Sequence, residues 1–174
     1  LIMSTIKVNK IIPVGGVPSG GGGGIIQVVS ATKTDTFTSS STSFVAITGL
    51  SVNITPTSSS SKILVYFSVD GSNTDAGATS AKLAVFKDGS NYLGANIGNK
   101  SRAWQIANYG DNNTGELIGF QFLDSPSTTS QITYDLRVAA QQATATINRS
   151  GSDNDSALFG YRSASTITAM EVSA

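Results

Sequence analysis

The sequence predicts an all-β protein, an antiparallel sandwich of the jelly-roll type. Short runs of β-branched and aromatic residues recur throughout residues 25–174, and Gly, Ser, Asn, Asp or Pro separates each run from the next. None of the runs has the apolar period of an amphipathic helix. Many short strands joined by turn-rich segments are typical of sandwiches built from antiparallel strands.

The expected strands follow one another along this whole region. In chain order they cover residues 25–29, 43–48, 51–55, 62–69, 82–87, 91–97, 116–123, 131–139 and 166–172. The Ser/Thr clusters at 39–43 and 57–61 lie between strong strand signals. They are short enough to be ordered loops, as connections of this length in compact domains usually are.

Two strands show which way their side chains face. In the strand at 131–139, every second residue is apolar (Ile132, Tyr134, Leu136 and Val138), which predicts one buried and one wetted face. In the strand at 62–69, both faces carry apolar residues, which predicts a strand that is central or covered on both sides.

A hairpin is expected at Asp88-Gly89. A tight primed turn needs positive φ, and the Asp-Gly pair supplies it at little cost. The strands at 82–87 and 91–97 on either side of this turn are therefore expected to pair antiparallel.

Ser19 and the glycine run that follows divide the chain into three parts. We expect residues 1–18 to be an extended N-terminal peptide, residues 19–24 a flexible linker, and residues 25–174 the β-sandwich head. In the peptide, Ile6 and Val8 alternate with polar residues before Ile11 and Ile12. This pattern can add an extended strand to an exposed sheet edge of another protein.

Composition excludes several classes of partner. Lys plus Arg and Asp plus Glu number 11 each, and charged residues make up only 13% of the chain, so neither nucleic acid nor a membrane surface is expected to bind. No apolar stretch approaches the length of a membrane helix. Cysteine is absent, so stability must come from burial, including burial between subunits.

The residue types argue against catalysis. The chain has no histidine and no cysteine, which removes the commonest general base and the commonest thiol nucleophile. Its carboxylates lie mainly in loops or at strand ends, and no catalytic residue and no cofactor is expected. The segments 70–75, 111–113 and 153–155 offer oxygen ligands of the kind calcium prefers, but Asp and Asn are also ordinary turn residues, and no metal is expected.

One region combines an aromatic residue with cations and amides, a mixture suited to contact with a sugar ring or a partner side chain. The candidate ligand contacts are Asn99, Lys100, Arg102, Trp104, Tyr109, Asp111, Asn112 and Asn113. The structural alternative is that Trp104 and Ile106 belong to a further strand and pack in the core or in a subunit interface.

The head carries more apolar β-surface than a single core obviously needs, which predicts a homotrimer. The candidate interface residues are Leu64, Tyr66, Phe120, Phe122 and Tyr134.

The chain resembles a family of phage proteins over nearly its whole length. The segments that carry the resemblance are the opening 3–11, the glycine run leading into 25–29, and residues 33–37, 44–52, 54–56, 62–65 and 167–172. In these segments the chain is similar to small tail-fibre or virion-surface proteins of tailed phages. The resemblance implies a TNF- or C1q-like jelly-roll head that forms trimers, and a virion-anchoring N-terminus, here Ile6, Val8, Ile11 and Ile12.

The resemblance implies a protein made in the host cytoplasm and carried on the virion surface. Its partners would be another virion structural protein, bound through the N-terminal peptide, and a host surface glycan. The sequence departs from long fibres because no coiled-coil or β-helical shaft separates anchor from head. A short fibre, head fibre or decoration knob therefore fits better. Two alternatives remain open: a carbohydrate-binding, lectin-like module, and a glycan-cleaving enzyme that uses carboxylates.

Overall fold

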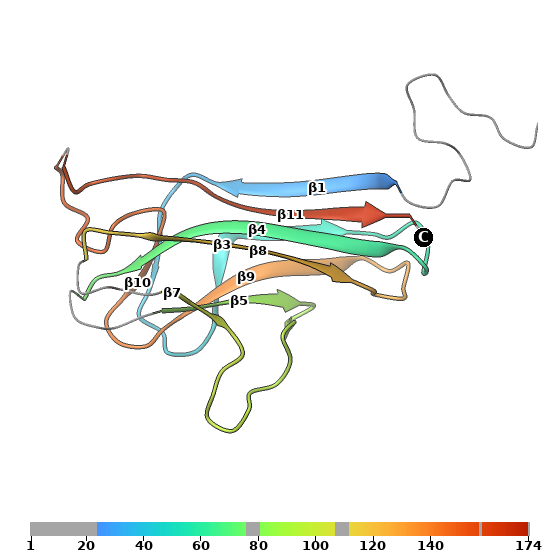
Figure 1. Ribbon diagram of the computed structural model, residues 1–174, viewed down its shortest axis with the longest axis horizontal. Helices are drawn as coiled ribbons and strands as arrows, with labels where there is room; N and C mark the ends of the chain where they lie inside the picture. Colours follow the sequence, from blue (N-terminus) through green and yellow to red (C-terminus); the bar gives the residue numbers. More distant parts are fainter. Residues whose placement is uncertain (1–23, 76–80, 107–111, 157, 174) are drawn as a thin grey trace, which may run out of the picture.

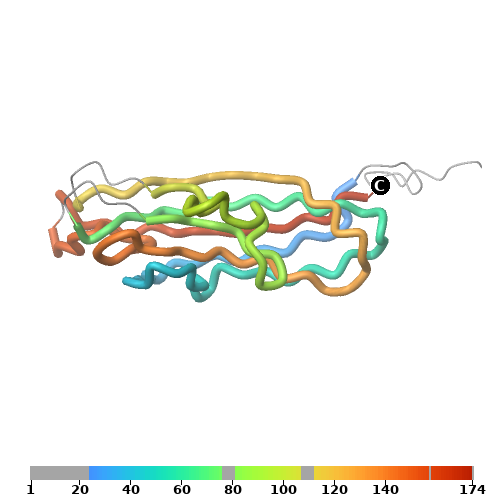
Figure 2. The backbone as a smooth tube through the Cα atoms, turned by 90° about the horizontal axis from the view of Figure 1, so that it is seen from below, coloured from blue at the N-terminus to red at the C-terminus, as the bar shows by residue number. Residues whose placement is uncertain are grey.

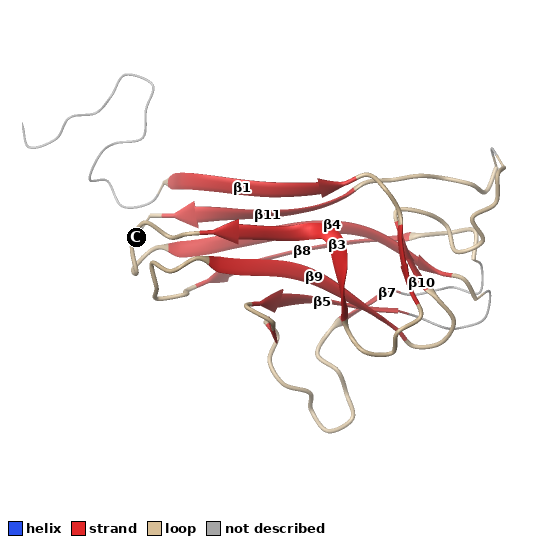
Figure 3. Ribbon diagram, turned by 180° about the vertical axis from the view of Figure 1, so that it is seen from behind, coloured by secondary structure: helices blue, strands red, loops and turns tan. Residues whose placement is uncertain are grey.

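The computed structural model describes residues 24–75, 81–106, 112–156 and 158–173. These residues form strands and no helix, and the strands pair antiparallel in two sheets that pack face to face (Figures 1 and 3). Seen from below, the molecule is elongated along the strand direction (Figure 2). The structure thus confirms an all-β, antiparallel, jelly-roll-like sandwich.

The first sheet contains six strands in the order β1-β11-β4-β10-β2, with β8 on the other edge of β4. Their bounds are β1 Ile25–Lys33, β2 Phe37–Ser39, β4 Lys62–Asn73, β8 Glu116–Asp124, β10 Ala145–Ile147 and β11 Ser165–Val172. Strand β4 lies between β11 and β8, so the expectation of a central strand is confirmed. Its outer face is not fully covered, since Leu64 is half-buried and Tyr66 is 42% exposed.

The second sheet contains five strands in the order β3-β9-β5-β6, with β7 also on β5. Their bounds are β3 Val45–Ile54, β5 Ala81–Lys87, β6 Ser90–Asn91, β7 Trp104–Ile106 and β9 Ile132–Ala140. Strand β9 has the expected buried face, with Ile132, Tyr134, Leu136 and Val138 all buried, but its other face is not fully wetted, because Asp135 and Ala139 are buried as well.

The core lies between the two sheets. Its largest fully buried side chains include Leu50, Ile54, Ile63, Phe67, Leu83, Ile106, Ile132, Tyr134, Leu136, Ile147 and Ile167. Burying one such side chain contributes about 1.5–3 kcal/mol. Because these residues come from both sheets, the sandwich is stabilised mainly by contact between its layers.

Three details differ from the expected strands. The expected strands at 43–48 and 51–55 are one strand, β3, whose pairing with β9 shifts between Ala46 and Ser51. Gly49 lies within this irregularity at φ +89°, which lets the strand bend without ending. The short strands β2 and β10 were not expected from the sequence, whereas β7, Trp104–Ile106, is the further strand that the structural alternative for Trp104 and Ile106 predicts.

The Asp88-Gly89 turn is confirmed, with φ of +49° and +80°. The strand after it is much shorter than residues 91–97: Ser90 and Asn91 pair with β5, Tyr92 N donates to Val85 O at 2.9 Å, and the chain then leaves the sheet. The Ser/Thr clusters are ordered loops. In the first, Ser41 N donates to Ser39 Oγ at 3.1 Å, and in the second Thr57 N donates to Glu171 Oε1 at 2.7 Å.

Candidate ligand-binding groove

The segment between β6 and β7 leaves the second sheet as a long loop, residues 92–103, which is the lowest feature of Figure 1. Asn91 holds the base of this loop, because its Nδ2 donates to Arg102 O at 2.8 Å and its Oδ1 accepts from Leu93 N at 3.0 Å. At the tip, Ile97 and Lys100 exchange two backbone hydrogen bonds of 3.0 Å around Gly98, whose φ is +58°. The loop is therefore organised at both ends.

A groove of about 470 Å³ lies between this loop, the segment 42–44 and the outer face of the second sheet. It is lined by Thr42, Ser43, Phe44, Lys82, Phe86, Asn91, Gly94, Ala95, Asn96, Ser101 and Ala139. Lys82, Ala139 and Phe86 form its floor because they occupy the outer positions of β5 and β9, opposite to the core residues Leu83 and Val85.

Two aromatic rings border the groove. The ring centroids of Phe44 and Phe86 are 5.7 Å apart, and the Arg137 guanidinium carbon lies 4.1 Å from the centroid of the Phe86 ring. Asp135 neutralises Arg137, with Arg137 Nε donating to Asp135 Oδ2 at 2.6 Å. The apolar wall is thus fixed by a cation–π contact and an ion pair beneath it.

Two smaller hollows adjoin the groove at Ser101. One, of about 400 Å³, is lined by Leu93, Ile97, Lys100, Ser101, Arg102 and Ala103. The other, of about 120 Å³, is lined by Lys82, Ser101, Ala103, Trp104, Gln105 and Gln141. Lys82 Nζ donates to Ser101 Oγ at 3.2 Å, so one cation borders both the groove and the smaller hollow.

The structure divides the ligand contacts expected from the sequence. Asn99, Lys100 and Arg102 lie on the exposed loop beside the groove. Trp104 is in β7, opposite Leu83, and packs toward the core with its ring centroid 5.1 Å from that of Phe67 and 4.9 Å from that of Phe120. Trp104 thus lies in a further strand and packs toward the core, as the structural alternative predicts, while part of its surface borders the smallest hollow.

Of the remaining candidate contacts, the two that are described, Asn112 and Asn113, do not line the groove. Tyr109 and Asp111 lie outside the described residues, as do Ile6, Val8, Ile11 and Ile12. Asn112 Nδ2 donates to Thr74 O at 3.2 Å, and Asn113 Oδ1 accepts from Ser152 Oγ at 2.7 Å. These two amides fasten loops at one end of the sandwich.

The candidate interface residues also separate. Leu64 and Tyr66 lie on the outer face of the first sheet, Phe120 is 43% exposed at the β8 edge, and Phe122 is half-buried against Tyr92. Tyr134 has no exposed surface, and its hydroxyl donates to Asp124 Oδ2 at 2.5 Å. Its assignment to a subunit interface is wrong, because the head itself already buries the whole side chain.

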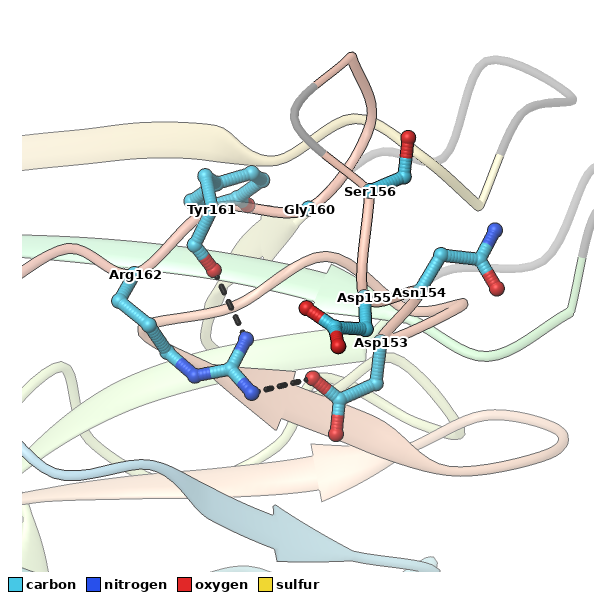
Figure 4. Close-up of a pocket in the computed structure, with 7 residues that line it drawn as sticks. All are labelled: Asp153, Asn154, Asp155, Ser156, Gly160, Tyr161 and Arg162. Carbon is cyan, nitrogen blue, oxygen red and sulfur yellow. Dashed lines mark hydrogen bonds and ion pairs between the residues drawn. The ribbon is translucent and has the colours of Figure 1, made fainter.

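A further hollow, of about 390 Å³, lies among the loops at the end of the sandwich opposite the start of β1 (Figure 1), and Figure 4 shows the residues that line it. Arg162 crosses it, with Nη2 2.7 Å from Asp153 Oδ1, and Arg149 also reaches Asp153, at 3.4 Å. The Asp153 carboxylate is thus already matched by two cations. Within the described residues, no group of three or more His, Cys, Asp or Glu side chains is placed to hold a metal ion.

Asp70 anchors this loop region to the first sheet. Its carboxylate is largely buried, accepts a hydrogen bond from Tyr161 Oη at 3.3 Å and accepts a second from Ser163 Oγ. Burial raises the pKa of Asp70 above its ordinary value, and the two hydrogen bonds oppose the rise only in part.

We expect Asp70→Asn to alter the pH dependence of stability. The pKa of Asp70 is raised in the folded state. Its stabilising contribution to the free energy of unfolding is therefore complete below the unfolded pKa, roughly 3.9, and is lost as the pH rises through the folded pKa. The neutral amide avoids this loss. The free energy of unfolding of the variant, relative to the original protein, should therefore be higher at pH 7 than at pH 3 in urea titrations. An unchanged difference between the two pH values would contradict this prediction.

No helix in the described part of the chain is long and apolar enough to cross a membrane.

No protein-family model matches the chain, and no curated protein matches it significantly. Three structures from infectious bursal disease virus are among the solved structures that are similar to it. The Gt strain structure is 15% identical with a TM-score of 0.42, over 96% of this chain and 42% of that chain. The T13 viral particle is 16% identical with a TM-score of 0.41, over 84% and 37%. The VP2 subviral particle is 16% identical with a TM-score of 0.37, over 84% and 38%. The chain thus spans less than half the length of these proteins.

Proposed function

We propose that this chain is a non-enzymatic structural protein of a phage virion, a short fibre or decoration knob that displays a β-sandwich head. The observation that carries the proposal is that both ends of the β-sandwich chain lie at the same end of the head. Ser173 N donates to Gly24 O at 2.9 Å, so the first strand begins and the last strand ends at the same end of the sandwich (Figure 1). A module held at that end would present its opposite end and its long loop to the medium.

The sequence resemblance supports the same role. It covers the N-terminal peptide, which would anchor the head to another virion protein through Ile6, Val8, Ile11 and Ile12. The glycines of the linker would let head and anchor adopt independent orientations. The ligand-binding groove would then contact the host surface from the side of the head.

The head is proposed to form a homotrimer through the outer face of the first sheet. One row across this face is entirely apolar, because Val28, Met170, Leu64 and Leu123 pair in register on β1, β11, β4 and β8. Val28 is 56% exposed and Leu123 is 50% exposed, and Tyr66 lies in the next row. A contiguous apolar patch of this kind marks an interaction site on a protein.

We expect Leu123→Lys to convert the trimer to a monomer without unfolding the head. The lysine would place a charge in the buried interface, which costs several kcal/mol when unpaired, whereas in the monomer the site is exposed. Sedimentation velocity would report the lost trimer, and a melting curve would report the intact fold. Leu158→Lys is the matched control, because Leu158 is exposed in a loop away from the sheet. A trimeric Leu123→Lys protein, or a monomeric original protein, would contradict the interface.

The second candidate is a carbohydrate-binding, lectin-like module that is not part of a virion. The groove beside Phe44 and Phe86 favours it, because an aromatic wall with amides and a cation is suited to a sugar. Electron microscopy separates the two functions. Gold-labelled antibodies against the head should decorate purified particles of the phage that encodes the chain. Unlabelled particles from cells that make the protein would refute the virion role and leave the lectin-like one.

A further inference from the structure

We propose that the groove between residues 42–44 and the 92–103 loop binds an anionic saccharide, with Phe44 and Phe86 against the sugar ring and Lys82 against its acidic group. This names the ligand class for the attachment role, and its biological setting rests on the proposed function. The proposal follows from the charge, the shape and the lining of the groove.

The groove and its two adjoining hollows have a charge bias that the chain as a whole lacks. The protein carries equal numbers of acidic and basic residues. The linings of the three hollows nevertheless include Lys82, Lys100 and Arg102 and no carboxylate. In contrast, the hollow in Figure 4 places two aspartates beside its arginine. An anion is therefore the ligand that the groove region favours electrostatically.

Lys82 is the cation that can act inside the groove. Arg137 also lies near, but Asp135 pairs with it and its guanidinium faces the Phe86 ring. Lys82 forms none of the ion pairs among the described residues, and its ammonium group donates to the neutral hydroxyl of Ser101. Since an ammonium group has three donors, Lys82 can bind Ser101 and a ligand carboxylate or phosphate together.

The rest of the lining suits a sugar better than a bare ion. Phe44 and Phe86 are half-buried and supply an apolar surface, while Thr42, Ser43 and Asn96 supply hydroxyl and amide groups at the rim. The floor residue Ala139 has a small side chain, which leaves room between the walls. The volume of about 470 Å³ lies within the range of small-molecule sites, about 300–1,000 Å³.

The test is calorimetric or NMR titration of the full-length protein with four probes: methyl glucuronide, glucose 6-phosphate, methyl glucoside and inorganic phosphate. At least one of the two acidic sugars should bind about tenfold or more tightly than both the neutral sugar and inorganic phosphate, because a charged hydrogen bond and ring contact would then act together. Whichever acidic sugar binds more tightly identifies a carboxylate or a phosphate as the preferred group.

Variants connect the binding to the groove. Lys82→Gln should weaken the acidic sugar by about tenfold or more, Lys82→Arg should retain most of the binding, and Phe86→Leu should weaken acidic and neutral sugars alike. Lys62→Gln is the matched control, because Lys62 is exposed on the other sheet, and its affinity should equal that of the original protein.

Three results would overturn the proposal. The first is no binding of either acidic sugar up to about 10 mM, near the weak limit of such sites. The second is equal affinity for inorganic phosphate and the acidic sugars, which would show a simple anion site, and the third is unchanged binding by a folded Lys82→Gln protein. The outcome is independent of the virion experiment. A groove that binds sugar in a protein absent from particles would sustain this inference and refute the proposed function.

Discussion

Replacing Tyr134 by alanine is expected to lower the free energy of unfolding of the head by about 3–5 kcal/mol. Tyr134 is among the largest fully buried side chains, and its ring packs against Phe122 at a centroid distance of 6.3 Å. The substitution would leave a cavity between the sheets. It would also remove the hydroxyl that donates to Asp124, a carboxylate that Lys87 Nζ approaches at 2.5 Å.

Urea titration would measure the loss, and two variants divide it. Tyr134→Phe keeps the ring and removes only the hydroxyl, so it should cost about 1–2 kcal/mol. Phe159→Ala removes an aromatic ring that is 51% exposed in a loop, and it should change stability by about 0.5 kcal/mol or less. A loss of stability for Tyr134→Ala no larger than that for Phe159→Ala would contradict the burial of Tyr134 in the core.

The alternation of apolar residues along β9 correctly predicts that Tyr134 is buried in the core. Tyr134 is two residues from Ile132 and from Leu136, so all three must share a face, and that face is the buried one. The assignment of Tyr134 to a subunit interface assumed that its ring was not needed to fill the core. The volume between two facing sheets depends on which strands oppose each other, and this cannot be read from one strand alone.

The long strands could be predicted because each carries its own local pattern, whereas the short ones form through pairing. Strand β10 has only three residues, and it is a strand because it lies between β2 and β4 and hydrogen-bonds to both. The strand expected at 91–97 fails for a related reason. After Asn91 the chain turns away from the sheet. The Asn91 side chain there hydrogen-bonds to the backbone of Leu93 and Arg102, in place of a further strand partner.

The groove could be predicted only in part. The alternation in β5 places Lys82 and Phe86 on the face opposite to Leu83 and Val85, so their outward orientation follows from the sequence. Phe44 is distant in sequence, and it reaches Phe86 only because β3, β9 and β5 are neighbours in the second sheet. The sequence singled out Trp104, which follows the 92–103 loop, as a candidate ligand contact because of its residue type. In the structure the ring of Trp104 packs toward the core.

Deleting residues 3–18 is expected to abolish incorporation of the protein into virions while leaving a folded, trimeric head. The peptide has too little apolar area to fold alone, so its order should depend on a partner. Its alternating apolar residues can join the edge of a partner sheet through main-chain hydrogen bonds. If three heads are tied together, three peptides bind at raised effective concentration, and their loss should reduce incorporation by about 100-fold or more.

Quantitative immunoblotting of purified particles would measure incorporation, and sedimentation with a melting curve would verify the truncated head. A full-length protein with Ile6→Lys and Val8→Lys should fail in the same way, because the charges would occupy the pockets for the apolar side chains. Asn9→Ala is the matched control, since Asn9 lies among the polar positions of the alternation and should be tolerated. Normal incorporation of the truncated protein would place the anchor within the β-sandwich, where the exposed β8 edge, with Leu117 and Phe120, would become the surface to test.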